Sequence, residues 1–137
     1  MELTAGNKRK STNNITIHHQ NTLSITNKSD ESSINLQMNH IRPHLICLTE
    51  HHLKESEITK FSLDGYKLAS SFCRREFLGG AVCIFISNNT IFQTIDLKQF
   101  CHEKTVEMCA VKLHLKSIKL ITFLHLQSPS RELKTIL

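Results

Sequence analysis

The stretch Leu45-Ile46-Cys47-Leu48-Thr49-Glu50 decides the fold expected for this chain. It is a continuous apolar run of strand length that leads directly into a carboxylate. Such a run is typical of a strand covered on both faces, as in the parallel sheets of α/β proteins. Open α/β sheets place ligands at the carboxyl ends of their strands, and this makes Glu50 the first candidate for a functional residue.

The residues upstream of this run predict a βαβ-like opening. Residues 15–21 carry β-branched side chains in alternation, which predicts a short strand ending at Asn21. An apolar pattern at i, i+4 and i+7 predicts a helix from Ser29 or Asp30 to Ile41, with Pro43 closing its far end. We expect this unit to set the end of the first strand beside the end of the second.

The residues downstream predict more strands than helices. We expect a short helix over 54–60, then strands over 66–70, 81–86, 91–95, 105–115 and 118–126, the last two forming a hairpin split by Lys116-Ser117. The final residues, 132–137, are amphipathic and predict the first turns of a helix. Residues 1–14 are polar and aperiodic and predict a disordered lead, which leaves one α/β (α+β) domain over 15–137.

Composition excludes several classes of protein. The 137 residues suit one domain, the N-terminus has no apolar segment typical of a secretory signal, and no run is long enough to span a membrane. We therefore expect an intracellular, nuclear or cytoplasmic protein without membrane contact. The net charge of +5 is compatible with a polyanionic partner, but Lys8, Arg9 and Lys10 supply most of it.

The five cysteines are odd in number and form no Cys-x-x-Cys pair. Because the chain has no export signal, this pattern favours neither a disulfide framework nor a zinc ribbon. Cys47, Cys83 and Cys109 stand inside apolar runs, where a free cysteine behaves as a small apolar side chain. We expect these three cysteines in the core.

Four residues are candidates for chemistry. Glu50 could hold Mg²⁺, which prefers one or two carboxylates completed by water and phosphate oxygens. Asn21 could steer a phosphate or a metal-bound water from the neighbouring strand end. Arg74 and Arg75 precede Gly79-Gly80 and could contact a phosphate backbone. The alternatives are a solvated glutamate, a turn asparagine and an ordinary surface loop.

The histidines include two adjacent pairs, His18-His19 and His51-His52. Neighbouring residues on a strand point to opposite faces, so at most one histidine of each pair can converge on a ligand. The pairs therefore do not predict a zinc site. The sequence also contains no phosphate-binding loop, dinucleotide fingerprint, nucleophile elbow or zincin motif.

Taken in order, the motifs resemble the endonuclease/exonuclease/phosphatase superfamily, and most closely the endonuclease domain of LINE-type non-LTR retrotransposons. The matching segments run from residue 19 to the end of the chain and are ordered as in the family. They are His19-Gln20-Asn21, Asn27-Lys28, Pro43–Glu50, Gly65-Tyr66, Cys73-Arg74, Gly79–Phe85, Glu107–Leu113 and Ser128-Pro129-Ser130.

The resemblance implies a partial four-layer α/β sandwich with two packed sheets, truncated on its C-terminal side. It also implies Mg²⁺-dependent cleavage of DNA phosphodiester bonds, with Glu50 as the metal-binding glutamate and Asn21 as the active-site asparagine of the first strand. DNA would be the partner, and no small-molecule cofactor is implied.

The sequence departs from the family at the residues that complete catalysis. The catalytic Tyr-Arg pair of the family falls on Leu126-Gln127, the third glycine of the loop is Ala81, and the chain ends before the Asp-x-Asn and Ser-Asp-His elements. Because such groups act as a unit, we expect this chain alone to be inactive. The truncation also predicts exposed apolar strands over 82–86 and 118–126. The alternative is a non-catalytic remnant that binds nucleic acid or a protein partner.

Overall fold

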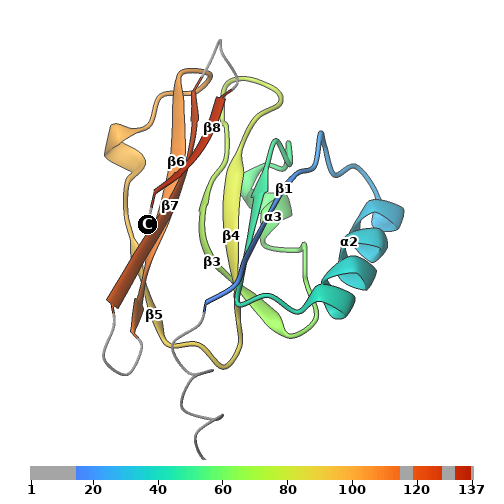
Figure 1. The fold of residues 1–137 in the computed structure, drawn as a ribbon. Helices are drawn as coiled ribbons and strands as arrows, with labels where there is room; N and C mark the ends of the chain where they lie inside the picture. The colour runs from blue at the N-terminus through green and yellow to red at the C-terminus, as the bar shows by residue number, and fades with distance from the viewer. Residues whose placement is uncertain (1–14, 115–118, 128–131, 137) are drawn as a thin grey trace, which may run out of the picture.

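The computed structural model describes residues 15–114, 119–127 and 132–136, which form a mixed α/β fold with two four-stranded sheets. The predicted lead over 1–14, the hairpin turn at 116–117 and the Ser-Pro-Ser segment at 128–130 lie outside the described residues. The elements in chain order are β1 (Ile17–Asn21), α2 (Lys28–Ile41), β2 (Leu45–Thr49), α3 (Glu55–Ile58), β3 (Tyr66–Phe72), β4 (Val82–Ser87), β5 (Phe92–Ile95), the short 3-10 helix η1 (Lys98–Phe100), β6 (Val106–His114), β7 (Lys119–Gln127) and β8 (Glu132–Ile136) (Figure 1).

The first sheet has the strand order β1-β2-β4-β3. β1 and β2 are parallel and are joined through α2, which confirms the βαβ-like opening. β2 spans the residues predicted for it, and all five are buried because the sheet is covered on both faces at this strand. Its other neighbour, β4, runs antiparallel. The carboxyl end of β2 therefore lies beside the amino end of β4.

α2 begins slightly earlier than its apolar pattern predicts. The N-cap is Asn27, whose side chain accepts a hydrogen bond of 3.0 Å from the backbone N–H of Asp30. Asp30 instead lies inside the first turn, where its carboxylate accepts from the backbone N–H of Thr26 at 2.9 Å. Apolar spacing reports the buried face of a helix and not its polar first turn, so it misses this boundary. The helix ends at Ile41, and Arg42 follows in the left-handed conformation.

The second sheet has the strand order β5-β6-β7-β8. β6 and β7 pair antiparallel from Val106↔Gln127 to His114↔Lys119, which confirms the predicted hairpin. The helical start predicted over 132–137 is wrong, because Glu132–Ile136 forms β8 along the free edge of β7. A segment this short is marginal as a helix in water, whereas an open strand edge offers its backbone hydrogen bonds.

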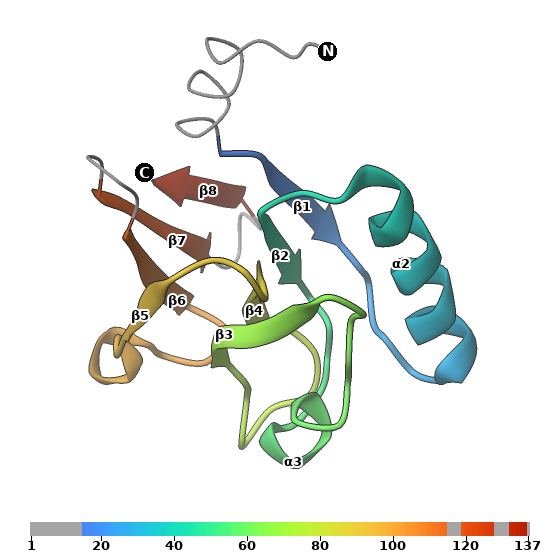
Figure 2. The ribbon, with the colours of Figure 1, turned by 90° about the horizontal axis from the view of Figure 1, so that it is seen from below.

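The layers are helices, first sheet and second sheet, in that order across the molecule (Figure 1). Seen along the other axis, α2 and α3 lie on the side of the first sheet that faces away from the second (Figure 2). Ile46, Leu48 and Phe85 pack on the helix side, and Cys47, Ile84 and Val111 pack between the sheets. Among the helices that the structure describes, none combines the length and the apolar character that a membrane span requires.

The helix-side core and the second sheet together prevent the exposure predicted for β4. Val82–Ile86 are at most 2% exposed, so the expected open apolar strand is wrong at this position. β7 has β6 on one side and β8 on the other, so neither of its edges is open. Cys47, Cys83 and Cys109 are buried and unbonded to one another, which confirms their prediction as core residues.

Candidate functional site

The carboxyl ends of β1 and β2 bring Asn21 and Glu50 together. The two strands are parallel and Asn21 lies in register with Thr49, so Glu50 follows at the same edge of the sheet. The Asn21 amide Nδ2 donates a hydrogen bond of 3.0 Å to Glu50 Oε2. Its Oδ1 accepts from the backbone N–H of Leu23 at 3.1 Å, which fixes the direction of the amide. The predicted juxtaposition is present, and the chemical roles of the two side chains remain predictions.

The backbone of Glu50 is held from two sides. Its N–H donates to the carbonyl of Ala81 at 2.8 Å, and its carbonyl accepts from the N–H of Ser24 at 2.7 Å. The residue has a φ of 54°, a left-handed conformation that costs a non-glycine residue about 1–2 kcal/mol. Only 7% of Glu50 is exposed, whereas Asn21 is exposed to solvent. These backbone contacts therefore fix the direction in which the Glu50 carboxylate points from the edge of the sheet.

His19 lies on the same face of β1 as Asn21, and His18 lies on the opposite face. The ring Nε2 of His19 is 3.3 Å from the hydroxyl of Thr49. Partial burial lowers the pKa of His19, and the neighbouring His18 lowers it further. The lowered pKa favours the neutral ring, which can act at this edge as a hydrogen-bonding group. Of this pair, one histidine lies on the face of β1 that carries Asn21, as the alternation of a strand requires.

The second histidine pair follows Glu50 and is split by burial. His51 is completely buried, and its Nδ1 accepts from the backbone N–H of Leu53 at 3.0 Å. Burial lowers the pKa of His51 to about 4, so its ring is neutral and part of the core. His52 is exposed. No cluster of three or more His, Cys, Asp or Glu side chains suited to a metal ion occurs within the described ranges.

The donor set at this edge fits magnesium better than zinc. Zinc in proteins takes three or four nitrogen, sulfur or carboxylate ligands, and the part of the chain that the structure describes contains no group of three or more His, Cys, Asp or Glu side chains that could supply them. Mg²⁺ is commonly held through one or two carboxylates, with water and substrate phosphate oxygens completing the octahedron. Glu50 would be the residue that holds it, and Asn21 would orient that carboxylate through its 3.0 Å hydrogen bond.

The two arginines predicted to contact phosphate have different environments. Arg74 donates from Nε to Glu107 Oε2 and from Nη1 to the carbonyl of Leu78, and its side chain is only 12% exposed. Its guanidinium is therefore engaged inside the protein. Arg75 is exposed, while its backbone N–H donates to the carboxylate of Glu103 at 2.7 Å. The phosphate contact remains a prediction for both arginines, and of the two only Arg75 is exposed.

The end of β7 belongs to the same edge of the molecule. Gln127 pairs with Val106 and Leu126 with Glu107, so the end of β7 lies beside the start of β6. The start of β6 in turn contacts the loop before β4, because Glu107 Oε1 accepts from the N–H of Ala81 at 3.0 Å. The backbone position at which the resemblance would place Tyr-Arg is therefore at the Glu50 end of the sheets.

A hollow of about 570 Å³ opens on the helix side of this edge. His52 and Ser24 line it next to the Glu50 backbone, and Lys28 and Lys60 also line it and supply positive charge. Glu31 and Glu57 also line this hollow, so its charge is mixed. The hollow therefore provides space beside the candidate site, but its lining is neither uniformly positive nor uniformly negative.

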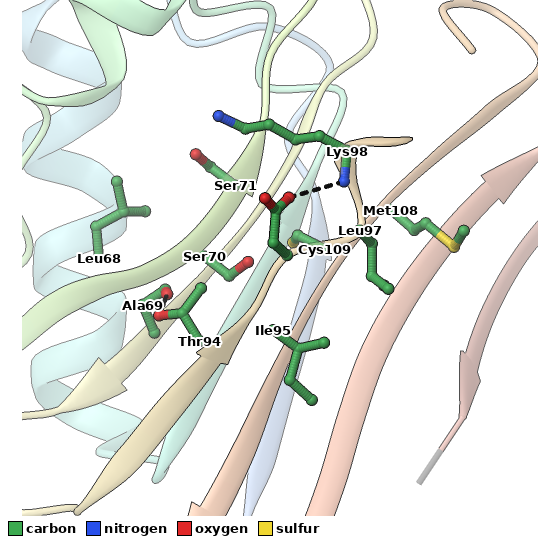
Figure 3. A pocket seen from close by; sticks show the side chains of 11 residues that line it. Leu68, Ala69, Ser70, Ser71, Thr94, Ile95, Leu97, Lys98, Met108 and Cys109 are labelled. Atoms are coloured by element: carbon green, nitrogen blue, oxygen red, sulfur yellow. Dashed lines mark hydrogen bonds between the residues drawn. The ribbon is translucent and has the colours of Figure 1, made fainter. Parts of the chain in front are cut away.

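A separate pocket of about 470 Å³ lies between β3 and the β5–η1 segment (Figure 3). Its Thr94 hydroxyl donates to the carbonyl of Ala69 at 2.6 Å, and its Ser70 hydroxyl accepts from the N–H of Ala110 at 3.3 Å. Its acid, Asp96, accepts from the N–H of Lys98 at 3.0 Å, the dashed line of Figure 3. These polar side chains form hydrogen bonds with backbone groups. None of the lining residues belongs to the Asn21–Glu50 site.

Glu107 is the residue whose importance the sequence analysis missed. It is 1% exposed and contacts Arg74, Ala81 and Lys104. A signal was available, since Glu107 shares the alternating inward positions of Cys109, Val111 and Leu113 along β6. A carboxylate at a buried position requires partners, and this requirement could have directed attention to it.

Comparison of the chain with protein-family models and with curated proteins found no match.

Proposed function

We propose that this chain carries the metal-binding edge of an endonuclease of the endonuclease/exonuclease/phosphatase type, with DNA phosphodiester bonds as the substrate class. The observation that carries the proposal is the contact between Asn21 and Glu50 at the carboxyl ends of two parallel strands. The arrangement of helices, first sheet and second sheet supports part of the four-layer sandwich of that superfamily.

Within this proposal Glu50 holds Mg²⁺ and Asn21 orients the carboxylate. The ion, when bound, would polarise the scissile phosphate and stabilise the leaving oxygen. The lowered pKa of His19 favours its neutral ring, which can hydrogen-bond a phosphate oxygen or water without adding charge. Arg75, exposed on the adjoining loop, would contact the phosphate backbone at a distance from the reacting bond.

Within this proposal, we expect the polypeptide on its own to cleave DNA weakly or not at all. The family tyrosine and arginine are replaced by Leu126 and Gln127, and the 137 residues contain no Asp-x-Asn or Ser-Asp-His tripeptide. In the family these elements position and deprotonate the attacking water. Acid–base and positioning groups contribute several orders of magnitude to hydrolytic rates, so a metal-binding residue without them should leave little activity.

The test combines metal binding with nicking of supercoiled plasmid. Titration with Mn²⁺, followed by its electron paramagnetic resonance signal, should show one site that Glu50→Gln abolishes. Plasmid incubated with Mg²⁺ should remain supercoiled, as it does in EDTA. Metal binding that survives Glu50→Gln would refute the proposed site. Mg²⁺-dependent nicking that Glu50→Gln removes would instead show that other residues replace the missing catalytic groups.

A non-catalytic nucleic-acid-binding role is the second candidate, and the loop after β3 favours it. Arg75 is exposed there beside Phe77 and Leu78, which are 47% and 87% exposed. Cationic and apolar side chains together suit contact with phosphates and bases. This role predicts DNA affinity that falls steeply with salt and persists in EDTA, whereas an enzyme site predicts a requirement for the metal.

A further inference from the structure

Glu107 lies at the start of β6 with both carboxylate oxygens occupied. Oε1 accepts from the N–H of Ala81 at 3.0 Å, and Oε2 accepts from Arg74 and from the N–H of Lys104 at 2.7 Å. The residue is 1% exposed. A carboxylate removed from water to this extent is stable only when it is paired and fully hydrogen-bonded, and these three donors satisfy that condition.

Ala81 connects Glu107 to the candidate metal site. Its N–H donates to Glu107, and its carbonyl accepts from the N–H of Glu50 at 2.8 Å. A second hydrogen bond joins the same two loops, because the carbonyl of Gly80, the residue before Ala81, accepts from the N–H of His52 at 3.0 Å. Two hydrogen bonds thus hold the loop after β2 against the loop before β4.

Both loops contain several residues in the left-handed backbone conformation. Glu50 and His52 have φ values of 54° and 64°, and Gly79, Gly80 and Ala81 have values of 82°, 63° and 81°. Non-glycine residues adopt this conformation only where their surroundings determine it. The direction of the Glu50 carboxylate therefore depends on contacts outside its own loop.

Arg74 completes the support from inside the loop before β4. A Cβ added to Gly80 would lie 2.2 Å from both Nε and Cζ of Arg74, so the guanidinium packs directly against the glycine backbone. Its Nη1 also donates to the carbonyl of Leu78 at 2.8 Å. The arginine both neutralises Glu107 and fills the space under the loop that carries Ala81.

We propose that Glu107, paired with Arg74, is a positioning residue for Glu50, acting through the backbone of Ala81. This inference rests on the proposed function in that Glu50 is taken to bind a divalent cation. Residues that orient a metal ligand typically change metal affinity by about 10–100-fold when they are removed. Glu107 is 1% exposed and both of its oxygens accept from protein donors, so its effect passes through the geometry of Glu50.

The test measures Mn²⁺ affinity and the amide resonance of Glu50 in the full chain. Glu107→Gln keeps an oxygen acceptor for Ala81 and should weaken Mn²⁺ binding by less than about tenfold. Glu107→Leu removes the acceptor and should weaken it by about tenfold or more. The matched control is Glu103→Leu, since Glu103 accepts from the N–H groups of Arg75 and Phe77 in the same loop, whereas the N–H of Ala81 donates to Glu107.

A second variant separates positioning from folding. Glu107→Leu alone leaves Arg74 buried and unpaired and could unfold the chain, whereas Arg74→Met combined with Glu107→Leu replaces the whole ion pair with apolar side chains. Circular dichroism at each Mn²⁺ titration temperature establishes that the double variant is folded. We expect it to show the same loss of affinity and a shifted Glu50 amide resonance.

The outcomes distinguish this inference from the proposed function. A folded double variant with unchanged Mn²⁺ affinity and an unshifted Glu50 resonance would overturn the positioning role. A wild-type chain without a Mn²⁺ site sensitive to Glu50→Gln would overturn the proposed function instead. In that case the Glu50 resonance still decides whether Glu107 fixes the backbone of this residue.

Discussion

Asn21 and Glu50 lie 29 positions apart in the chain and meet through a 3.0 Å hydrogen bond from Nδ2 to Oε2. The contact exists because β1 and β2 are parallel and end in register, with Asn21 opposite Thr49. It gives the candidate site one oriented carboxylate and one exposed amide.

Asn21→Ala should weaken Mn²⁺ binding by about tenfold, because the Glu50 carboxylate loses the donor that orients it. The free energy of unfolding should fall by only about 1 kcal/mol, the usual net worth of one hydrogen bond. Asn89→Ala, in the exposed turn after β4, is the control and should change neither quantity. Equal Mn²⁺ affinity in the Asn21 variant and in the wild type would show that the amide does not orient the ligand.

Arg74→Leu should destabilise the protein by about 3–5 kcal/mol, because it leaves the buried carboxylate of Glu107 unpaired. Arg75→Leu changes an exposed side chain next to it and should alter the free energy of unfolding by less than about 0.5 kcal/mol. Urea denaturation of the two variants measures the difference. Similar stabilities would mean that the ion pair contributes little to the folded state.

The protein should lose stability as pH falls from 6.5 towards 4, because burial lowers the pKa of His51 from 6.5 to about 4. In that interval the unfolded chain binds a proton at His51 that the folded chain excludes, so acid favours unfolding. As pH falls from 6.5 to 4, protonation of His51 in the unfolded chain should lower the free energy of unfolding by about 3 kcal/mol.

Chemical denaturation between pH 4 and pH 7 checks this dependence on His51. His51→Gln keeps an acceptor for the N–H of Leu53 and cannot titrate, so its stability should vary less with pH than that of the wild type. His40→Gln, on the exposed surface of α2, should retain the wild-type slope. Identical slopes in all three proteins would assign the acid sensitivity to other groups.

Ala81→Gly should leave the stability unchanged or raise it by up to about 1 kcal/mol. A left-handed φ of 81° costs an alanine about 1–2 kcal/mol, and this relief exceeds the loss of one buried methyl group, worth about 1 kcal/mol. Ala110→Gly is the matched control, since Ala110 is also buried but lies within β6. Thermal melts should show the control destabilised. An equal loss in both variants would contradict a strained backbone at Ala81.

The short apolar runs account for what was predicted correctly. β2 and β4 could be placed because continuous runs of apolar residues are stable only where both faces of a strand are covered. The position of Asn21 beside Glu50 followed from the same reasoning, since parallel strands joined by a helix end at one edge. β8 could not be assigned, because five residues carry too little periodicity and the edge of β7 supplied the pairing.

The sequence by itself determined the βαβ opening, the buried strands and the carboxylate at the end of β2, since each depends on local patterns of apolar and polar residues. Only the tertiary structure decided the role of Arg74, which pairs with Glu107 across 33 positions, and the way Ala81 joins Glu107 to Glu50. Local patterns report which face of an element is buried. Ion pairs and left-handed loops depend on which distant groups meet, and that is fixed when the two sheets pack.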